Sequence, residues 1–193
     1  MIEVRSFGQV KGQYFLLGAI IIITLFFTGF YLVKNESIFS SSYKADDLKY
    51  LFYNMQSEYP RVFNYGINES DITVELRNFT EFSRSIYSSN ILNFTTLLIY
   101  TTNISDNLNV TIVNYLGYDT EVELNISGTL KNLTVTDEGL NSTIFSAVNP
   151  KFVMTVKFNS QEKQLSMVRD KYNLYTYLQL RRKSEIIKGS VLA

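Results

Sequence analysis

The chain has 193 residues with 18 basic and 18 acidic side chains, and it contains no Cys, His or Trp. A net charge of zero provides no basic field for nucleic acid, so we expect no nucleic-acid partner. The missing residue types exclude thiolate nucleophiles, imidazole bases and most transition-metal sites. A chain without cysteine that is exported would suit a prokaryotic cell surface.

Residues 1–12, MIEVRSFGQVKG, form a short leader in which Arg5 and Lys11 outnumber the single acid Glu3. Lysines also follow the apolar run, so the number of basic residues on each side does not decide which end of the run faces the cytoplasm. Long domains cross membranes largely regardless of such counts. We therefore predict a cytoplasmic N-terminus and an extracytoplasmic C-terminal domain at the cell surface.

The stretch 14–33, YFLLGAIIIITLFFTGFYLV, carries no charge. A helix of this length is about 30 Å long, which matches the hydrocarbon thickness of a bilayer. We predict a transmembrane helix over 13–33 and a lipid bilayer as its partner. A secretory signal peptide is the alternative, but its apolar core usually has about 7–15 residues before a small-x-small cleavage site. Here the apolar run is followed by Lys34-Asn35-Glu36, which is not a small-x-small cleavage site.

The triplet Lys11-Gly12-Gln13 lies directly before this apolar run, and the arrangement resembles precursors of the type IV pilin and archaellin superfamily. The resemblance implies cleavage between Gly12 and Gln13 by a dedicated membrane peptidase, with the apolar helix retained. Many members have Glu at the fifth mature position, where this chain has Leu17, and an archaeal variant has Ser third, where this chain has Phe15. These departures favour a minor or pilin-like protein over a major fibre subunit. An uncleaved signal anchor is the alternative.

Residues 34–90 are predicted to form an extracytoplasmic helical stalk or linker. Apolar side chains recur there at steps of three and four, namely Leu48, Leu51, Phe52, Met55 and Tyr59. We expect an N-cap at Ser41 or Ser42, a break at 40–42 and a helix end at Pro60.

A turn is predicted at Asn64-Tyr65-Gly66 and a second helix at 71–89. One side of this second helix would carry apolar residues, namely Ile72, Leu76, Phe79 and Ile86. The alternation over 72–76 also fits a strand, so both assignments stay open there.

From residue 91 the apolar period changes to two, which predicts a β-sandwich domain over 91–193. The expected strands are 92–102, 108–116, 120–127, 129–136, 142–147, 151–158, 163–169 and 172–182. Short strands at this spacing favour an antiparallel sandwich, Ig-like as first choice, or a barrel. The expected fold class is therefore one N-terminal transmembrane helix, a short helical region and an all-β head, α+β in sum. The basic run 181–183 is typical of a solvated strand end.

Nine Asn-x-Ser/Thr triplets occur, where chance predicts about three. They begin at Asn35, Asn68, Asn78, Asn93, Asn103, Asn109, Asn125, Asn132 and Asn141. The excess indicates N-glycosylation of an exported surface. A half-buried strand also alternates polar, apolar and polar residues, so strand patterning is the second explanation. The two are compatible, because such a strand presents Asn and Thr together on its wet face.

No hydrolase elbow, phosphate-binding loop or zinc motif is present in the sequence. Asp137-Glu138 and Asp106-Asn107 lie in expected turns and could offer oxygen ligands to Ca²⁺, but no EF-hand spacing accompanies them. We expect no enzyme, no catalytic residues, no metal, no cofactor and no small-molecule substrate.

Two functional hypotheses follow from these features. The first is a type IV pilin-like subunit or minor pilin of an archaeal cell surface, a membrane-anchored structural glycoprotein with other pilin-like subunits as partners. The alternative is a permanently anchored β-sandwich binding module that tethers surface-layer proteins or a surface machine.

Overall fold

The computed structural model describes residues 45–69, 71–87 and 92–193. The predicted leader, the span 13–33, the break at 40–42 and the cleavage position Gly12–Gln13 lie outside these residues. Within the described ranges, no helix is both long and apolar enough to cross a bilayer. Residues 45–193 form one compact unit, in which two helices precede nine strands.

The helices are α2 (Ala45–Glu69) and α3 (Ile72–Tyr87). The helix predicted at 71–89 is confirmed, which decides against a strand over 72–76. Its first turn is capped by Asp71, whose Oδ1 accepts a hydrogen bond from the Val74 N–H at 3.0 Å. Ile86, predicted on the buried side, is 52% exposed.

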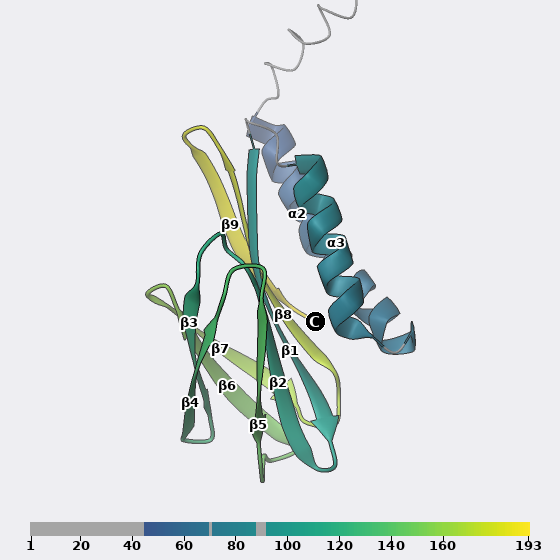
Figure 1. The fold of residues 1–193 in the computed structure, drawn as a ribbon, viewed down its shortest axis with the longest axis vertical. Coiled ribbons are helices and arrows are strands. Elements are labelled where there is room, and N and C mark those ends of the chain that lie inside the picture. The colour runs from purple at the N-terminus through teal and green to yellow at the C-terminus, as the bar shows by residue number, and fades with distance from the viewer. Residues whose placement is uncertain (1–44, 70, 88–91) are drawn as a thin grey trace, which may run out of the picture. The chain divides into compact units, whose positions relative to one another are not determined.

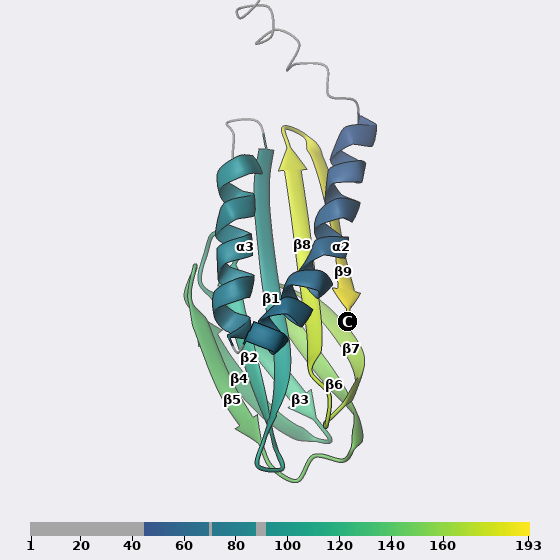
Figure 2. The same cartoon turned by 90° about the vertical axis from the view of Figure 1, so that its right-hand side faces the viewer.

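The predicted helix end at Pro60 is wrong, because α2 continues to Glu69 with the proline inside it. Tyr59 and Phe63 flank the proline and are both buried in the core beneath the helix. This packing outweighs the one backbone hydrogen bond that a proline removes. Figure 2 shows α2 changing direction partway along its length, as a proline inside a helix produces.

The predicted turn at Asn64-Tyr65-Gly66 is also wrong, because these residues lie within α2. Gly66 is buried. A Cβ at this position would come within 2.8 Å of the Ile72 Cα, so glycine allows the start of α3 to approach α2. The glycine therefore serves helix packing and no turn.

The strands form two antiparallel sheets, ordered β5-β2-β1-β8-β9 and β4-β3-β6-β7. This confirms the expected antiparallel β architecture with helices beside it. The strands are β1 (Leu92–Ile104), β2 (Asn107–Tyr115), β3 (Thr120–Ile126), β4 (Thr129–Val135), β5 (Leu140–Phe145), β6 (Lys151–Phe158), β7 (Gln161–Val168), β8 (Asn173–Arg182) and β9 (Glu185–Leu192).

Strand β9 was not predicted. It follows a turn that begins at Lys183, where φ is +52°, and Arg182 Nη2 lies 2.8 Å from Glu185 Oε2 across that turn. The basic run 181–183 therefore belongs to a hairpin and does not end the sheet. Helix α2 packs against β9, where Gln56 Nε2 donates to the Ser190 carbonyl at 3.0 Å. A Cβ at Gly189 would lie 2.9 Å from Cζ of Phe52, so the strand needs glycine beneath that ring.

The central strands β1, β2 and β8 of the five-stranded sheet are buried on both faces. Figures 1 and 2 show the helices on one side of this sheet and the other sheet opposite. Leu97 and Ile99 of β1 join the core between the two sheets. Leu98, between them in sequence, joins the core beneath α2 and α3. Helices α2 and α3, which lie within the range 34–90, thus share a core with the β strands.

Two buried asparagines fasten the crossovers between the sheets. Asn114 at the end of β2 donates through Nδ2 to the carbonyls of Tyr118 and Val135 at 2.8 and 3.0 Å. Asn173 at the start of β8 donates to the Val168 carbonyl at 2.9 Å. Each amide satisfies backbone groups where the chain leaves one sheet for the other.

Candidate functional site

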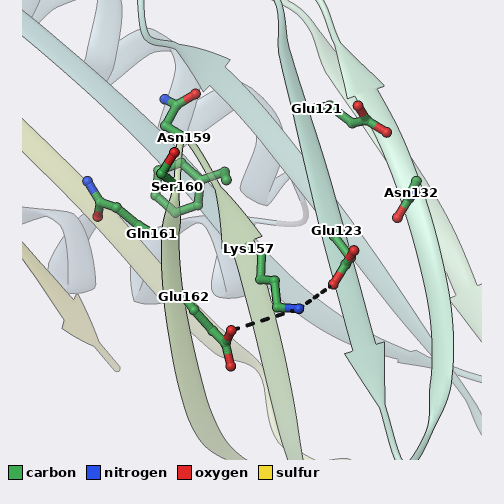
Figure 3. A pocket seen from close by; sticks show the side chains of 9 residues that line it. Glu121, Glu123, Asn132, Lys157, Asn159, Ser160, Gln161 and Glu162 are labelled. Atoms are coloured by element: carbon green, nitrogen blue, oxygen red, sulfur yellow. Dashed lines mark ion pairs between the residues drawn. The ribbon is translucent and has the colours of Figure 1, made fainter.

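The four-stranded sheet presents a polar hollow on the face turned away from the sandwich core (Figure 3). In the strand register, Glu123 of β3 is opposite Asn132 of β4 on one side and Lys157 of β6 on the other. Side chains in such register pairs lie next to each other on one face. The hollow has a volume of about 440 Å³ and is lined by Glu121, Glu123, Asn132, Lys157, Phe158, Asn159, Ser160, Gln161 and Glu162.

Lys157 lies between two carboxylates in the hollow. Its Nζ is 2.9 Å from Oε1 of Glu123 and 3.8 Å from Oε2 of Glu162. The hydrogen bond that Lys157 donates to Glu123 and the negative charges of Glu123 and Glu162 raise the pKa of Lys157, so the amine stays protonated. Together with Glu121, the carboxylates outnumber this single ammonium group. The hollow therefore offers many hydrogen-bond acceptors, a few donors and a charge balance on the acidic side.

Eight of the nine Asn-x-Ser/Thr triplets begin within the described residues, and Asn35 lies outside them. The asparagine is exposed in six cases, which are Asn68, Asn78, Asn93, Asn103, Asn132 and Asn141. Asn109 and Asn125 are half-buried. Asn132 is the triplet asparagine that lines the polar hollow.

The alternation expected of a half-buried strand is present at Asn132-Leu133-Thr134. Leu133 is 6% exposed and belongs to the sandwich core, while Asn132 and Thr134 on either side are exposed. The triplet on α3 differs, because the helical turn carries Thr80 into the core, where it is fully buried. Thr80 Oγ1 donates to the Leu76 carbonyl at 2.7 Å and lies 3.0 Å from the Tyr59 hydroxyl.

The outer side of the helix layer has a different chemistry. Large aromatic side chains are exposed there, with Tyr50 at 70%, Tyr65 at 54% and Phe82 at 60%. A groove between α2 and α3 is lined by Arg61, Val62, Tyr65, Glu75, Phe79 and Phe82. We call this surface the aromatic helix face. Its composition suits contact with another protein surface.

Polar contacts fasten α3 to the sheet below it. The Tyr115 hydroxyl donates to Oε1 of Glu81 at 2.9 Å, and Arg84 Nη1 lies 2.6 Å from Oε1 of Glu138. Burial raises the pKa of Tyr115 and, more strongly, that of Tyr59. Both phenols therefore stay neutral in the folded protein.

The acids considered for Ca²⁺ serve turn structure. Asp137 Oδ1 accepts a hydrogen bond from the Gly117 N–H at 2.8 Å, and Glu138 pairs with Arg84. Asp106 lies in the turn between β1 and β2 with a φ of +66°. Over the residues that the structure describes, no three Asp, Glu, His or Cys side chains are grouped to hold a metal ion.

Comparison with known proteins gives no family assignment. No protein-family model matches the chain, and a search of curated proteins found no significant match. The function must therefore be inferred from the sequence and from the geometry of these two surfaces.

Proposed function

We propose that this chain is a membrane-anchored extracytoplasmic structural protein, a type IV pilin-like subunit or minor pilin of an archaeal cell surface. The observation that carries the proposal is the order of segments along the chain. The uncharged run 14–33 follows Lys11-Gly12-Gln13 and is separated by about a dozen residues from α2. Helix α2 then packs on an antiparallel sheet. Resemblance to pilin precursors implies this order of leader, apolar helix, sheet-packed helix and β head.

The aromatic helix face supports an assembly role. Tyr50, Tyr53 and Tyr65 are exposed along α2, the helix that follows the predicted span, and Phe82 is exposed on the neighbouring α3. Exposed aromatic residues are enriched at the centres of protein interfaces. A face of this kind, on a helix that follows in sequence the segment that would enter a fibre, suits contacts with neighbouring pilin-like subunits.

The β head would face the outside of the cell, with residues 1–12 in the cytoplasm before processing. We infer an Ig-like head from the two facing antiparallel sheets and the crossovers between them. The triplet asparagines on its surface fit an exported glycoprotein. This role is structural and requires no catalysis, metal or cofactor.

A second candidate is a permanently anchored module that binds surface-layer proteins or a surface machine. It is favoured by Leu17, which stands where many pilins carry Glu. In that case the apolar run would only tether the β head, and the leader would remain attached.

The mature N-terminus tests the two candidates. The pilin-like proposal predicts that protein from its native membrane begins at Gln13, measured by intact mass and N-terminal sequencing. Gly12→Val should block processing, because a peptidase cleft that accepts glycine has no room for a branched side chain. Gly8→Val, in the same leader, is the matched control and should be processed normally. An intact leader in the unaltered protein would reject the pilin-like proposal and support the tether.

A further inference from the structure

We propose that Asn132 is the principal N-glycan acceptor of the folded β domain and that the polar hollow beside it seats the first sugars of that glycan. The inference rests on the extracytoplasmic position proposed above. Two independent features support it, which are the accessibility of this one triplet and the hollow that its asparagine lines.

The reaction sets the structural requirement. Nδ2 of the asparagine attacks C1 of a sugar that is joined through phosphate to a lipid carrier. A nitrogen–carbon bond forms, the bond from C1 to the phosphate oxygen breaks, and the carrier leaves as a phosphate anion with that electron pair. Nδ2 loses one proton to a base of the transferase. A triplet is therefore competent on a folded domain only if its amide and its Ser or Thr hydroxyl are both accessible.

Asn132-Leu133-Thr134 meets this requirement. Both polar residues are exposed, and Leu133 between them holds the segment on the sandwich core. The triplet lies on β4, an edge strand of the four-stranded sheet. Within the described residues, no hydrogen bond is formed by the Asn132 amide, so its Nδ2 is free to react.

Three triplets are closed in the folded domain because their hydroxyl residues are buried. Thr80 is 0% exposed, Thr111 is 5% and Thr95 is 9%. These residues complete the triplets that begin at Asn78, Asn109 and Asn93. A transferase could reach these hydroxyls only before folding or after local unfolding.

Three further triplets begin at Asn103, Asn125 and Asn141, and in each of them the side-chain amide is hydrogen-bonded. The triplet that begins at Asn68 lies on α2, outside the β domain, and ends at Ser70, outside the described residues. Asn103 Nδ2 donates to Oδ1 of Asp170 at 3.1 Å, and Asn141 Nδ2 donates to the Thr134 carbonyl at 3.0 Å. Asn125 is half-buried, and its Oδ1 accepts the Gly128 N–H at 3.0 Å. Modification at Asn103 or Asn141 would first break a native contact of the nitrogen that reacts, and Asn125 is less exposed than Asn132. Asn132 has no such contact to lose.

The hollow suits a sugar attached at its rim. Figure 3 shows Asn132 beside Glu121 and Glu123, with Lys157 between them and the segment 159–162. Sugar hydroxyls both donate and accept hydrogen bonds, and these side chains supply carboxylate acceptors together with ammonium and amide donors. Its volume of about 440 Å³ falls within the range of small-molecule sites, roughly 300–1,000 Å³.

Glycopeptide mass spectrometry of the full-length protein from native membranes tests the acceptor. We expect sugar on most copies of the Asn132 peptide and on few copies of the Asn78 and Asn109 peptides. Asn132→Gln should remove most of the carbohydrate mass, and Asn78→Gln, the matched control, should remove little. Sugar on Asn78 or Asn109 with Asn132 bare would overturn the inference.

The same measurement separates this inference from the proposed function. Sugar at Asn103 or Asn141 with Asn132 bare would overturn the inference and leave the extracytoplasmic position intact. Bare triplets together with an intact leader would reject both. Bare triplets on a protein processed to Gln13 would overturn only the inference.

A double-mutant comparison of melting temperatures tests whether the hollow binds the first sugars of the glycan. The glycoprotein should melt several degrees above Asn132→Gln, because the seated sugar is ordered on the sheet. In a Lys157→Ala background that difference should fall by half or more. Lys151→Ala changes an exposed lysine on the same strand outside the hollow and should leave the difference unchanged. Equal differences in the two lysine backgrounds would show that the hollow does not hold the glycan.

Discussion

Helices cover the five-stranded sheet, while the four-stranded sheet is open to solvent on its outer face. On the covered side, β1 has an unbroken buried run over 94–101 because both of its faces lie against protein. On the open side, β6 alternates strictly, with Phe152, Met154 and Val156 inward and Lys157 outward. The comparison shows that a strand's apolar pattern reports how many layers cover it.

This difference also separates two kinds of surface. The helix layer exposes aromatic side chains such as Tyr50 and Phe82, and the bare sheet exposes charged and amide groups around Lys157. Apolar surface favours contact with protein, and polar surface favours solvent or sugar. We therefore expect the two sides of the domain to face different surroundings.

Cutting a core side chain beneath the helices should have the largest effect. Leu98 is 0% exposed in the core under α2 and α3, and Leu98→Ala should lower the free energy of unfolding by about 2–5 kcal/mol. Val153, 49% exposed on the bare sheet, is the control, and Val153→Ala should change it by about 0.5 kcal/mol or less. Urea unfolding of the full chain in mild detergent, followed by circular dichroism, measures both. Equal losses would mean that the helices add no real core.

Replacing a buried asparagine should cost much more stability than replacing an exposed one, and this difference should be nearly as large as that between Leu98→Ala and Val153→Ala. Asn114 satisfies carbonyls at a crossover, and its Oδ1 accepts the Leu116 N–H at 2.9 Å. Asn114→Ala leaves these buried groups unpaired and should cost about 2–4 kcal/mol. Asn132→Ala, on the exposed face, should cost about 0.5 kcal/mol or less in protein that carries no glycan. A small loss for Asn114→Ala would show that water replaces its amide.

The close contact between α2 and α3 can be tested by whether Gly66→Ala raises or lowers the stability of the domain. Gly→Ala within a helix normally stabilises by about 1 kcal/mol. At Gly66 a Cβ would meet the Ile72 backbone at 2.8 Å, so Gly66→Ala should instead destabilise by about 1–3 kcal/mol. Ser57→Ala, at an exposed position of the same helix, should be neutral or slightly stabilising. A stabilising Gly66→Ala would show that the start of α3 lies too far from α2 for a Cβ at residue 66 to meet it.

Alkaline pH should lower the stability of the domain through Tyr59, by less than the substitutions described above. Burial raises the pKa of Tyr59 above its ordinary value, so above about pH 10 the unfolded chain loses a proton that the folded protein keeps. Stability is unaffected below that pH and falls as the pH rises further, by about 1.4 kcal/mol per pH unit for each such tyrosine. Tyr59→Phe should make this decline shallower, as measured by urea midpoints between about pH 8 and about pH 11. An unchanged slope would mean that Tyr59 ionises freely in the folded state.

Much of the β architecture was predictable because alternation depends on local sequence. Strand β6 matches its prediction, residues 151–158, to the residue. Strand β9 was missed because Ile186 and Ile187 are consecutive and Gly189 weakens the pattern. Its position depends on Phe52 and Gln56, which are far away in sequence.

The helix errors have the same origin. Pro60 and Gly66 are breakers by local rules, but Tyr59, Phe63 and Ile72 supply packing that those rules do not include. At the candidate site, the triplet asparagines were visible in the sequence. The polar hollow was not, because it forms only where β3, β4 and β6 bring their side chains together.

The attachment of α2 to β9 has a mechanical consequence. A pull on residue 45 along the axis of α2 would reach the sheet through core side chains of this helix such as Leu48 and Phe52, and through Gln56, which donates to Ser190 of β9. The first half of α2 lies along β8 and β9 in Figure 2, so such a pull loads the hydrogen bonds between these two strands together, in shear. The tension that the domain withstands would then depend on the pairing of β8 with β9 and on the core beneath α2.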